Sequence, residues 1–334
     1  MLGATVSVVG HKEYNEQTID ADFWKEVFGV PVIAGEPKRI GEGQVGMNLR
    51  YSLQSDDANV PASVVVKLAS PDPISRATGI SLRNYEREVK FYNEIANTLD
   101  VRKPHCYFAD WHEEAGDIAI VLEDMTPCEQ GDQIRGCGID EARISVTELS
   151  KLHGPRWGDA SLSKIDWLQR RDADDAARLE GLYAMVKPGF LAVHGEAIRR
   201  ECGEEGIAFI ETLGTMMTRY VNAKDEPFTV THGDYRLDNL LFATPAGGVA
   251  CAVVDWQTPG HGNGVADLAY FIGAGLLPED RRAHEWELVD LYIAGLESYG
   301  HEINHDWICS HYKREAISGV IMAVIASQIV GRTD

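Results

Sequence analysis

Polar side chains interrupt an otherwise apolar stretch, VTHGDYRLDNLLF, that begins and ends like a buried strand. Asp234 and Asn239 lie in its middle, and Asp255 follows a second apolar run, VACAVV. Phosphoryl transfer requires one carboxylate beside the attacking hydroxyl and hard oxygen ligands for Mg²⁺. Asp234 suits the first role, and Asn239 and Asp255 suit the second. The bland alternative is a polar turn in which Asp234 only caps nearby amides, but the combination with VVDW is much more specific.

Two short strands must bring these side chains together. The residue pattern predicts strands over 239–242 and 249–255, connected by TPAGG. Such a pair would return Asp255 to the place where the loop after Asp234 delivers Asn239. The sequence therefore predicts one cleft for all three oxygen-bearing side chains.

A glycine loop lies far upstream of this stretch. Gly41, Gly43 and Gly46 fit the spacing GxGxxG. The dinucleotide-binding version has a strand before the loop and a helix opening at the third glycine, whereas here a strand pattern follows over 48–53. A loop between antiparallel strands is instead typical of kinases, where it covers nucleotide phosphates. The alternative is a β-turn that only needs positive φ.

One lysine and one glutamate complete a nucleotide site in the expected order. Lys67 ends a VVVK run, where its ammonium could neutralise the α and β phosphates. Glu88 lies on a predicted amphipathic helix over 82–98 and could hold that lysine extended, with Glu86 and Glu94 as close alternatives. Each residue taken alone is better explained as a solvated surface charge, whereas together they fill the expected roles in the right order.

The distribution of strand and helix patterns indicates two lobes. A strand-rich first third precedes a mainly helical remainder, which predicts an α+β chain with an N-terminal nucleotide-binding lobe over 1–125 and a C-terminal catalytic and substrate lobe over 126–334. Besides the segments above, we expect strands at 63–68, 117–122 and 228–231 and helices at 17–29, 141–153, 173–185, 191–222, 280–299 and 306–330.

Composition excludes several function classes. The net charge of −21 argues against a nucleic-acid or anionic-membrane binder, although it is compatible with a cationic substrate. Six scattered cysteines without a CxxC motif indicate reduced thiols in a cytoplasmic protein. The N-terminus does not resemble a secretory signal. The most apolar segment, 317–330, is shorter than the roughly 20 residues that span a bilayer, so we expect no membrane insertion.

The segment HEINH, His301 to His305, matches the HExxH pattern of zinc hydrolases. That chemistry needs an unbroken helix with both imidazoles on one face. Gly300 precedes the motif and Asp306 resembles a helix N-cap, so we expect the motif to lie in a turn.

Long stretches resemble the aminoglycoside phosphotransferase and choline kinase superfamily. THGDYRLDNLLF and VVDWQTPGHGNGVADLAYFI are most similar to its ecdysteroid-kinase-like members and to phosphotransferase domains related to acyl-CoA dehydrogenase fusions. RIGEGQVGMNLRYSL, REVKFYNEI and VLEDMTP resemble the phosphate loop, the glutamate helix and the hinge, and LSKLHGPRW resembles a segment after the hinge. The resemblance implies a protein-kinase-like two-lobed fold that uses ATP and Mg²⁺ to phosphorylate a small-molecule hydroxyl.

The resemblance also implies roles for individual residues. Asp234 would be the catalytic base or would position the hydroxyl, and Asn239 and Asp255 would be the metal ligands. His232 would organise the loop, and Asp267 would hydrogen-bond that loop from a helix start, whether or not it also acts as an N-cap.

The hinge would contribute the adenine site. Backbone groups of Glu123 and Met125 would bind the base, with GTP left open as a donor. The HRD and DFG strings of protein kinases are absent, which argues against a protein substrate.

The acceptor is the least determined part of this hypothesis. Apolar pocket walls would favour an apolar alcohol, sterol-like or hydroxyacyl, whereas carboxylates would favour an aminoglycoside or amino alcohol. A non-enzymatic alternative is a nucleotide-binding pseudokinase or scaffold, but no expected lysine, aspartate or metal ligand is missing. Candidate walls are Trp157, Trp167, Tyr183, Met185 and the surroundings of Trp256 and His261.

Overall fold

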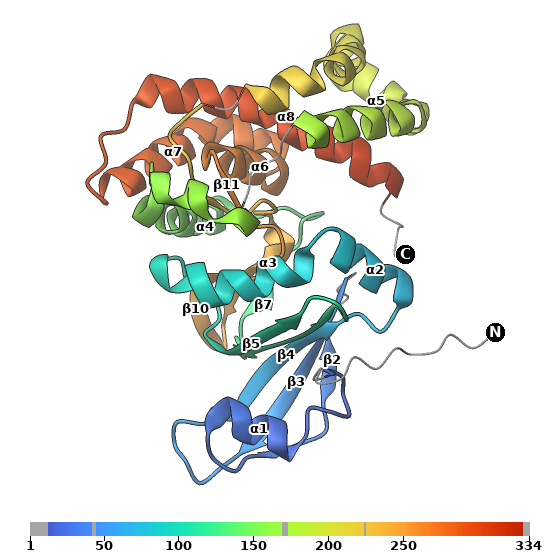
Figure 1. The fold of residues 1–334 in the computed structure, drawn as a ribbon. Helices are drawn as coiled ribbons and strands as arrows, with labels where there is room; N and C mark the ends of the chain where they lie inside the picture. Colours follow the sequence, from blue (N-terminus) through green and yellow to red (C-terminus); the bar gives the residue numbers. More distant parts are fainter. Residues whose placement is uncertain (1–12, 42–44, 169–172, 224, 330–334) are drawn as a thin grey trace, which may run out of the picture. The chain divides into compact units, whose positions relative to one another are not determined.

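The computed structural model describes residues 13–41, 45–168, 173–223 and 225–329 (Figure 1). The chain divides into two compact units. The first comprises Met1–Gln130 with Leu241–Pro259, and the second comprises Gly131–Leu240 with Gly260–Asp334. An antiparallel sheet dominates the first unit and helices dominate the second, which confirms the predicted α+β class with its sheet in the N-terminal part and its helices in the C-terminal part.

The first unit is built on a six-stranded sheet in the order β1-β3-β4-β6-β5, with β2 also paired to β3. Its recorded strand pairings are antiparallel. The predicted strands at 48–53, 63–68 and 117–122 are confirmed. The strands are β1 (Ile33–Ala34), β2 (Lys38–Ile40), β3 (Gly46–Gln54), β4 (Ser63–Ala69), β5 (Cys106–His112) and β6 (Asp117–Glu123).

Alternation along β3 explains which face of the sheet is covered. Leu49 and Tyr51 are buried in one apolar cluster with Phe23 and Trp24 of α1 (Ala21–Phe28). Full burial of side chains of this size stabilises by about 1.5–3 kcal/mol each. Asp20 caps the start of α1 by accepting hydrogen bonds from two backbone amides.

A helical segment and a hairpin complete the first unit. The predicted helix over 82–98 is confirmed as three consecutive pieces: α3 (Asn84–Lys90), a π-helical turn and a 3₁₀ turn. It is preceded by α2 (Pro73–Ser81). The predicted hairpin is confirmed as β9 (Leu240–Thr244) and β10 (Gly247–Val253), with β7 (Glu129–Gln130) paired to β9.

The second unit consists mainly of helices. Helix α4 packs on α7, and α8 packs on both α5 and α6. A short pair of strands, β8 (Thr229–Thr231) and β11 (Gly260–Gly262), completes it. The helices are α4 (Ile139–His153), α5 (Ala173–Asn222), α6 (Val265–Gly275), α7 (Pro278–Glu297) and α8 (His305–Ile329). Within the described ranges, no helix combines the length and the apolar content that crossing a bilayer requires.

The predicted break between residues 185 and 191 is wrong. The chain stays helical through Pro188 and turns instead at Gly203, where φ is 67° and ψ is −169°. Tyr183 and Phe190, on either side of the proline, are both buried in one cluster with Leu213. This shared packing outweighs the hydrogen bond that proline removes, and glycine supplies the left-handed backbone for the turn.

Candidate functional site

Lys67 lies at the centre of a buried ionic cluster in the first unit. Its neighbours on β4, Val66 and Leu68, face the apolar cluster, so alternation turns the lysine toward the opposite face. The ammonium nitrogen is 2.8 Å from Glu88 Oε1 and 3.0 Å from Asp255 Oδ1. Burial alone would lower the pKa of Lys67, but Asp255 and Glu88 outweigh it and the pKa is raised. The ammonium is therefore a fixed positive charge at neutral pH.

The structure distinguishes between the candidate glutamates. Glu88 is 1% exposed and faces Lys67. Glu86 instead pairs with Arg83, the N-cap residue of α3, at 2.7 Å and with Lys90 of α3 at 2.9 Å. Two carboxylates surround one ammonium in the Lys67 cluster, so the cluster has an excess negative charge that suits an additional cation.

The last glycine of the loop packs directly on the lysine. A Cβ at Gly46 would lie 3.2 Å from Lys67 Cε and 3.4 Å from the carbonyl oxygen of Leu68. This close approach leaves little room for a side chain where β3 begins. Gly41 has φ of 66°, and Gly43 lies outside the described residues.

Asp255 has a left-handed backbone, with φ of 65°. The next residue, Trp256, is fully buried and stacks on Phe91 with ring centroids 4.0 Å apart and an interplanar angle of 7°. The indole nitrogen donates to the Val253 carbonyl oxygen at 3.2 Å. These contacts hold an unfavourable φ, and they leave the Asp255 carboxylate 41% exposed although it is paired with Lys67.

Glu123 and Met125, at and just after the end of β6, each have one backbone group that is already hydrogen-bonded within the protein. The Glu123 amide donates to the His105 carbonyl oxygen at 2.8 Å, and the Met125 carbonyl oxygen accepts from the Cys128 amide at 2.8 Å. Recognition of a purine here would therefore depend on the Glu123 carbonyl oxygen and the Met125 amide.

The second unit holds Asp234 and Asn239 on one loop. Asn239 Nδ2 donates to the Asp234 carbonyl oxygen at 2.8 Å and to its Oδ2 at 2.9 Å. Because both bonds use the amide nitrogen, they orient the Asn239 amide oxygen as the atom that could bind a metal ion. The side chain of Asn239 is buried, and that of Asp234 is 33% exposed.

Asp267 holds the backbone of this loop. Its Oδ2 accepts from the His232 amide at 2.6 Å, and its Oδ1 accepts from the Gly233 amide at 3.0 Å. Asp267 lies in the first turn of α6, whose N-cap residue is Gly264. Its carboxylate therefore fixes the loop rather than capping its own helix. His232 is fully buried, and its Nδ1 accepts from the Asp234 amide at 3.3 Å.

Two further buried residues support Asp267 and were not singled out from the sequence. His153, at the end of α4, is fully buried, with Nε2 3.4 Å from Asp267 Oδ2 and Nδ1 2.7 Å from the Tyr292 hydroxyl. A Cβ at Gly264 would lie 2.6 Å from His153 Nδ1. The segment LSKLHGPRW contains the signal, but the histidine has no partner that sequence alone could identify.

Arg236 and Tyr270 were also not assigned a role from the sequence. Arg236 Nε is 3.2 Å from Asp234 Oδ2, and the Tyr270 hydroxyl hydrogen-bonds the same aspartate. Asp234 is thus contacted by a cation and by neutral donors.

The HEINH motif lies outside regular helix at its first histidine, as predicted, because α8 begins at His305. His301 Nε2 lies 2.7 Å from the Gly154 carbonyl oxygen, and His305 Nε2 lies 2.9 Å from Asp290 Oδ1. The two imidazoles therefore engage separate partners. Across the part of the chain that the structure describes, no group of three His, Cys, Asp or Glu side chains could hold a metal ion.

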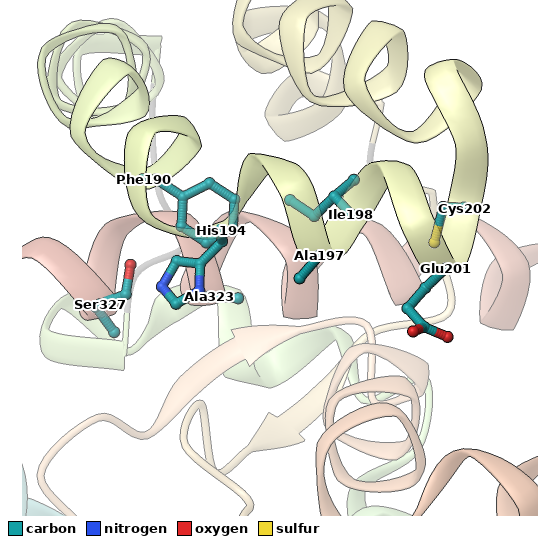
Figure 2. Close-up of a pocket in the computed structure, with 9 residues that line it drawn as sticks. Phe190, His194, Ala197, Ile198, Glu201, Cys202, Ala323 and Ser327 are labelled. Carbon is teal, nitrogen blue, oxygen red and sulfur yellow. The ribbon is translucent and has the colours of Figure 1, made fainter.

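A groove of about 620 Å³ lies between α5 and α8, and none of the residues predicted to line a pocket is among its lining residues. Figure 2 shows Phe190, Ala197 and Ile198 of α5 on one side and Ala323 of α8 on the other. Small alanines between larger side chains create the hollow.

Two candidate pocket walls, Tyr183 and Trp167, are buried, as is Trp256, whose surroundings were also predicted to contribute to the pocket. Tyr183 and Trp256 are fully buried, and Trp167 is 4% exposed. Tyr183 belongs to the cluster between α5 and α8, and Trp256 stacks on Phe91.

Comparisons with known proteins agree with this arrangement. Residues 177–305 match the model of the ecdysteroid kinase-like family. Acyl-CoA dehydrogenase family member 10 from Mus musculus is 37% identical over 75 residues, which are 21% of this chain and 7% of that protein. The chain thus matches only a small part of that curated relative.

Solved structures share the fold at low sequence identity. An ethanolamine kinase from Plasmodium vivax aligns with 99% of this chain and 88% of its own, at 10% identity and a TM-score of 0.53. A choline kinase from Cryptosporidium parvum Iowa II aligns with 88% and 84%, at 12% identity and 0.52. APH(2″)-IIa in its streptomycin–ATP ternary complex aligns with 94% and 99%, at 13% identity and 0.50. These findings confirm the kinase-like fold and the resemblance to this superfamily.

Proposed function

We propose that this chain, which has a kinase-like fold and an ecdysteroid kinase-like segment, transfers the γ-phosphoryl group of ATP to a hydroxyl of a small molecule. One observation carries the proposal. Asp234 and Asn239 are joined through two hydrogen bonds, and Asp267 fixes the backbone immediately before them. Positioning of this kind is the main requirement of phosphoryl transfer, because the protein needs to do little covalent chemistry.

The first unit would bind the nucleotide. Lys67, held by Glu88, provides a fixed positive charge for the α and β phosphates. The glycine loop that ends at Gly46 covers these phosphates, with backbone amides as donors. The Glu123 carbonyl oxygen and the Met125 amide bind adenine.

Asn239 and Asp255 would hold Mg²⁺ through the amide oxygen and the carboxylate. Two such protein ligands, with the remaining positions taken by phosphate oxygens and water, are usual for this ion. The excess negative charge beside Lys67 and the exposed part of the Asp255 carboxylate support the assignment. When bound, Mg²⁺ neutralises charge on the phosphates.

Asp234 is the base in this proposal. The acceptor hydroxyl gives its proton to the Asp234 carboxylate while its oxygen forms a bond to the γ-phosphorus. The bond from that phosphorus to the bridging oxygen breaks, and ADP leaves with the electron pair. Asp267 and His232 keep the loop in position for this step.

The function is tested by incubating purified protein with labelled Mg-ATP and hydroxylated metabolites and antibiotics, read by mass spectrometry. The set includes apolar alcohols, hydroxyacyl compounds, amino alcohols and aminoglycosides, because the net charge of −21 is compatible with cationic acceptors. We expect Asp234→Asn to abolish transfer and to leave Mg-ATP affinity within about threefold. Full transferase activity in that variant would refute the assignment.

A companion variant tests the proposed metal ligand. Asp255→Ala should weaken Mg-dependent nucleotide binding, measured by titration calorimetry with and without Mg²⁺. Equal affinity for Mg-ATP in the variant and the wild type would contradict the role of Asp255. Tight binding without turnover of any compound would favour a pseudokinase instead.

We further propose a reducing compartment such as the cytoplasm. All six cysteines are free thiols, and this supports the expectation from their spacing.

A further inference from the structure

We propose that Arg236 is a catalytic residue that stabilises the phosphoryl group as it passes Asp234. The inference rests on the proposed function and extends it to a side chain outside the HGD and Asn239 positions.

The backbone presents Arg236 on the same face as the base. Arg236 is extended, with φ of −139° and ψ of 164°, so alternate side chains point to opposite sides. Tyr235 is fully buried and its hydroxyl donates to the Ser145 carbonyl oxygen at 2.7 Å, while Leu237 is 1% exposed. Asp234 and Arg236 therefore face outward together, and the arginine side chain is 36% exposed.

The guanidinium is fixed between two carboxylates. Arg236 Nε is 3.2 Å from Asp234 Oδ2, and Nη1 is 2.6 Å from Asp238 Oδ2. Asp238 is itself held, because its Oδ1 accepts from the Gln133 amide at 3.1 Å. The Gln133 side chain also accepts from the Leu237 amide at 2.9 Å. Gln133 therefore holds both the Asp238 carboxylate and the backbone of Leu237.

Arg236 keeps its charge in this position. Burial alone would lower the pKa of its guanidinium, but Asp234 and Asp238 outweigh that effect and the pKa is raised. Burial and the neighbouring Asp234 raise the pKa of Tyr270 to about 12, so Tyr270 is a neutral donor at physiological pH. Arg236 is thus the cation that contacts Asp234 in this loop, beside the neutral donors Tyr270 and Asn239.

The reaction creates a need for such a cation. The acceptor oxygen must lie about 3 Å from the Asp234 carboxylate to give up its proton. The γ-phosphoryl oxygens, which are anionic, then approach a carboxylate that is also anionic. A guanidinium has five N–H donors, and Arg236 uses one on Nε and one on Nη1 for the two aspartates. Its other donors are available to phosphoryl oxygens.

Arg236 transfers no proton in this step. The acceptor proton moves to Asp234, the bond from oxygen to the γ-phosphorus forms, and ADP leaves with the electrons of the broken bond. The guanidinium lowers the energy of the charge that accumulates between donor and acceptor, and this effect appears in kcat rather than in nucleotide affinity.

The test compares Arg236→Gln and Arg236→Lys with the wild type, using Mg-ATP and an acceptor from the screen. We expect Arg236→Gln to lower kcat by about 10²–10³-fold while KM for ATP changes by less than about threefold. Arg236→Lys, which keeps the charge but not the fork of donors, should lose about tenfold. Affinity for Mg-ADP with aluminium fluoride should fall in Arg236→Gln, whereas affinity for Mg-ADP alone should not.

Arg143→Gln is a matched control. Arg143 also bridges two carboxylates, Asp140 at 2.9 Å and Glu287 at 2.7 Å, and is 40% exposed. Its loss should leave kcat unchanged. A second readout removes the side chain: Arg236→Gly should regain activity when guanidinium is added, at concentrations that do not stimulate the wild type.

Specific results overturn the inference. Wild-type kcat in Arg236→Gln, or a loss confined to KM for ATP, would show that Arg236 does not stabilise the transferring group. Equal affinities of wild type and Arg236→Gln for the aluminium fluoride complex would show the same. These results are distinct from failure of the proposed function, in which the wild type itself would neither bind Mg-ATP nor transfer phosphate.

Discussion

The two units hold their candidate site residues by different means. In the first unit, Lys67, Glu88 and Asp255 restrain each other through charge, and Lys67 and Glu88 are almost fully buried. In the second unit, Asp267 restrains the loop through neutral backbone amides. A buried ion cluster fails when one charge is removed, whereas a hydrogen-bonded loop loses one bond at a time. The first unit is therefore expected to respond more strongly to single substitutions.

The largest effect is expected at the buried lysine. Lys67→Met leaves Glu88 and Asp255 facing each other without a counter-charge and should lower the free energy of unfolding by about 3–5 kcal/mol. Urea denaturation measures this effect. Lys151→Met is the matched control, because Lys151 pairs with Glu148 but is 41% exposed, and it should cost less than about 1 kcal/mol. Equal losses of unfolding free energy in Lys67→Met and Lys151→Met would show that the buried ion cluster is no more sensitive to substitution than an exposed ion pair.

A smaller effect is expected at the loop anchor. Asp267→Asn replaces one accepting oxygen by an NH₂ group that faces a backbone amide, so it should lower the free energy of unfolding by about 1–3 kcal/mol. Because the loop carries Asp234, kcat should fall more than the affinity for Mg-ATP does. Wild-type kcat in a folded Asp267→Asn would show that the anchor does not position the loop.

Loss of the hydrogen bond between Tyr292 and His153, which contacts Asp267, should have a smaller effect than Asp267→Asn. Tyr292→Phe keeps the ring that packs edge-on against His153 and removes the hydroxyl 2.7 Å from Nδ1. We expect a loss of about 1 kcal/mol in the free energy of unfolding and a several-fold lower kcat. Tyr312→Phe, which removes a hydrogen bond from its hydroxyl to Glu285 at 3.1 Å, is the control for stability without a change in kcat.

The smallest effect is expected at Glu86, the glutamate of α3 that does not pair with Lys67, and its contribution to stability should depend on pH. Hydrogen bonds from Arg83, and then from Lys90, lower the pKa of Glu86 to about 2. Its folded pKa lies below the unfolded value of about 4.3, so its stabilisation is present above that value and is lost as the pH falls toward about 2. Glu86→Gln should cost about 0.5–1 kcal/mol at pH 7 and progressively less below pH 4. A pH-independent cost would attribute the effect to packing.

Alternation made the sheet of the first unit predictable. The VVVK run and the residues after the glycines alternate cleanly, and they form β4 and β3. β5 was not predicted, because its residues Cys106–His112 are mostly half-buried on both faces and show no alternation. The break in α5 was misplaced because proline is a strong local signal, whereas the packing that overrides it is tertiary.

Sequence alone proposes candidate site residues where chemistry and spacing coincide. Asp234, Asn239 and Asp255 were proposed because their types fit phosphoryl transfer, and the structure shows the contacts of each. His153 and Arg236 were not assigned roles, since their importance arises from partners that are distant in sequence or from side chains that share a face. The choice of Glu88 over Glu86 likewise depended on helix phase, which a pattern alone leaves open.

The face-to-face stack of Trp256 on Phe91 has a mechanical consequence for the first unit. Phe91 directly follows α3, which carries Glu88, and Trp256 directly follows Asp255. The stacked rings therefore connect the two segments that carry the Glu88 and Asp255 carboxylates, in addition to the ion pairs that both carboxylates form with Lys67. If α3 moved, the turn after β10 would move with it. Glu88 and Asp255 would then approach or leave Lys67 together.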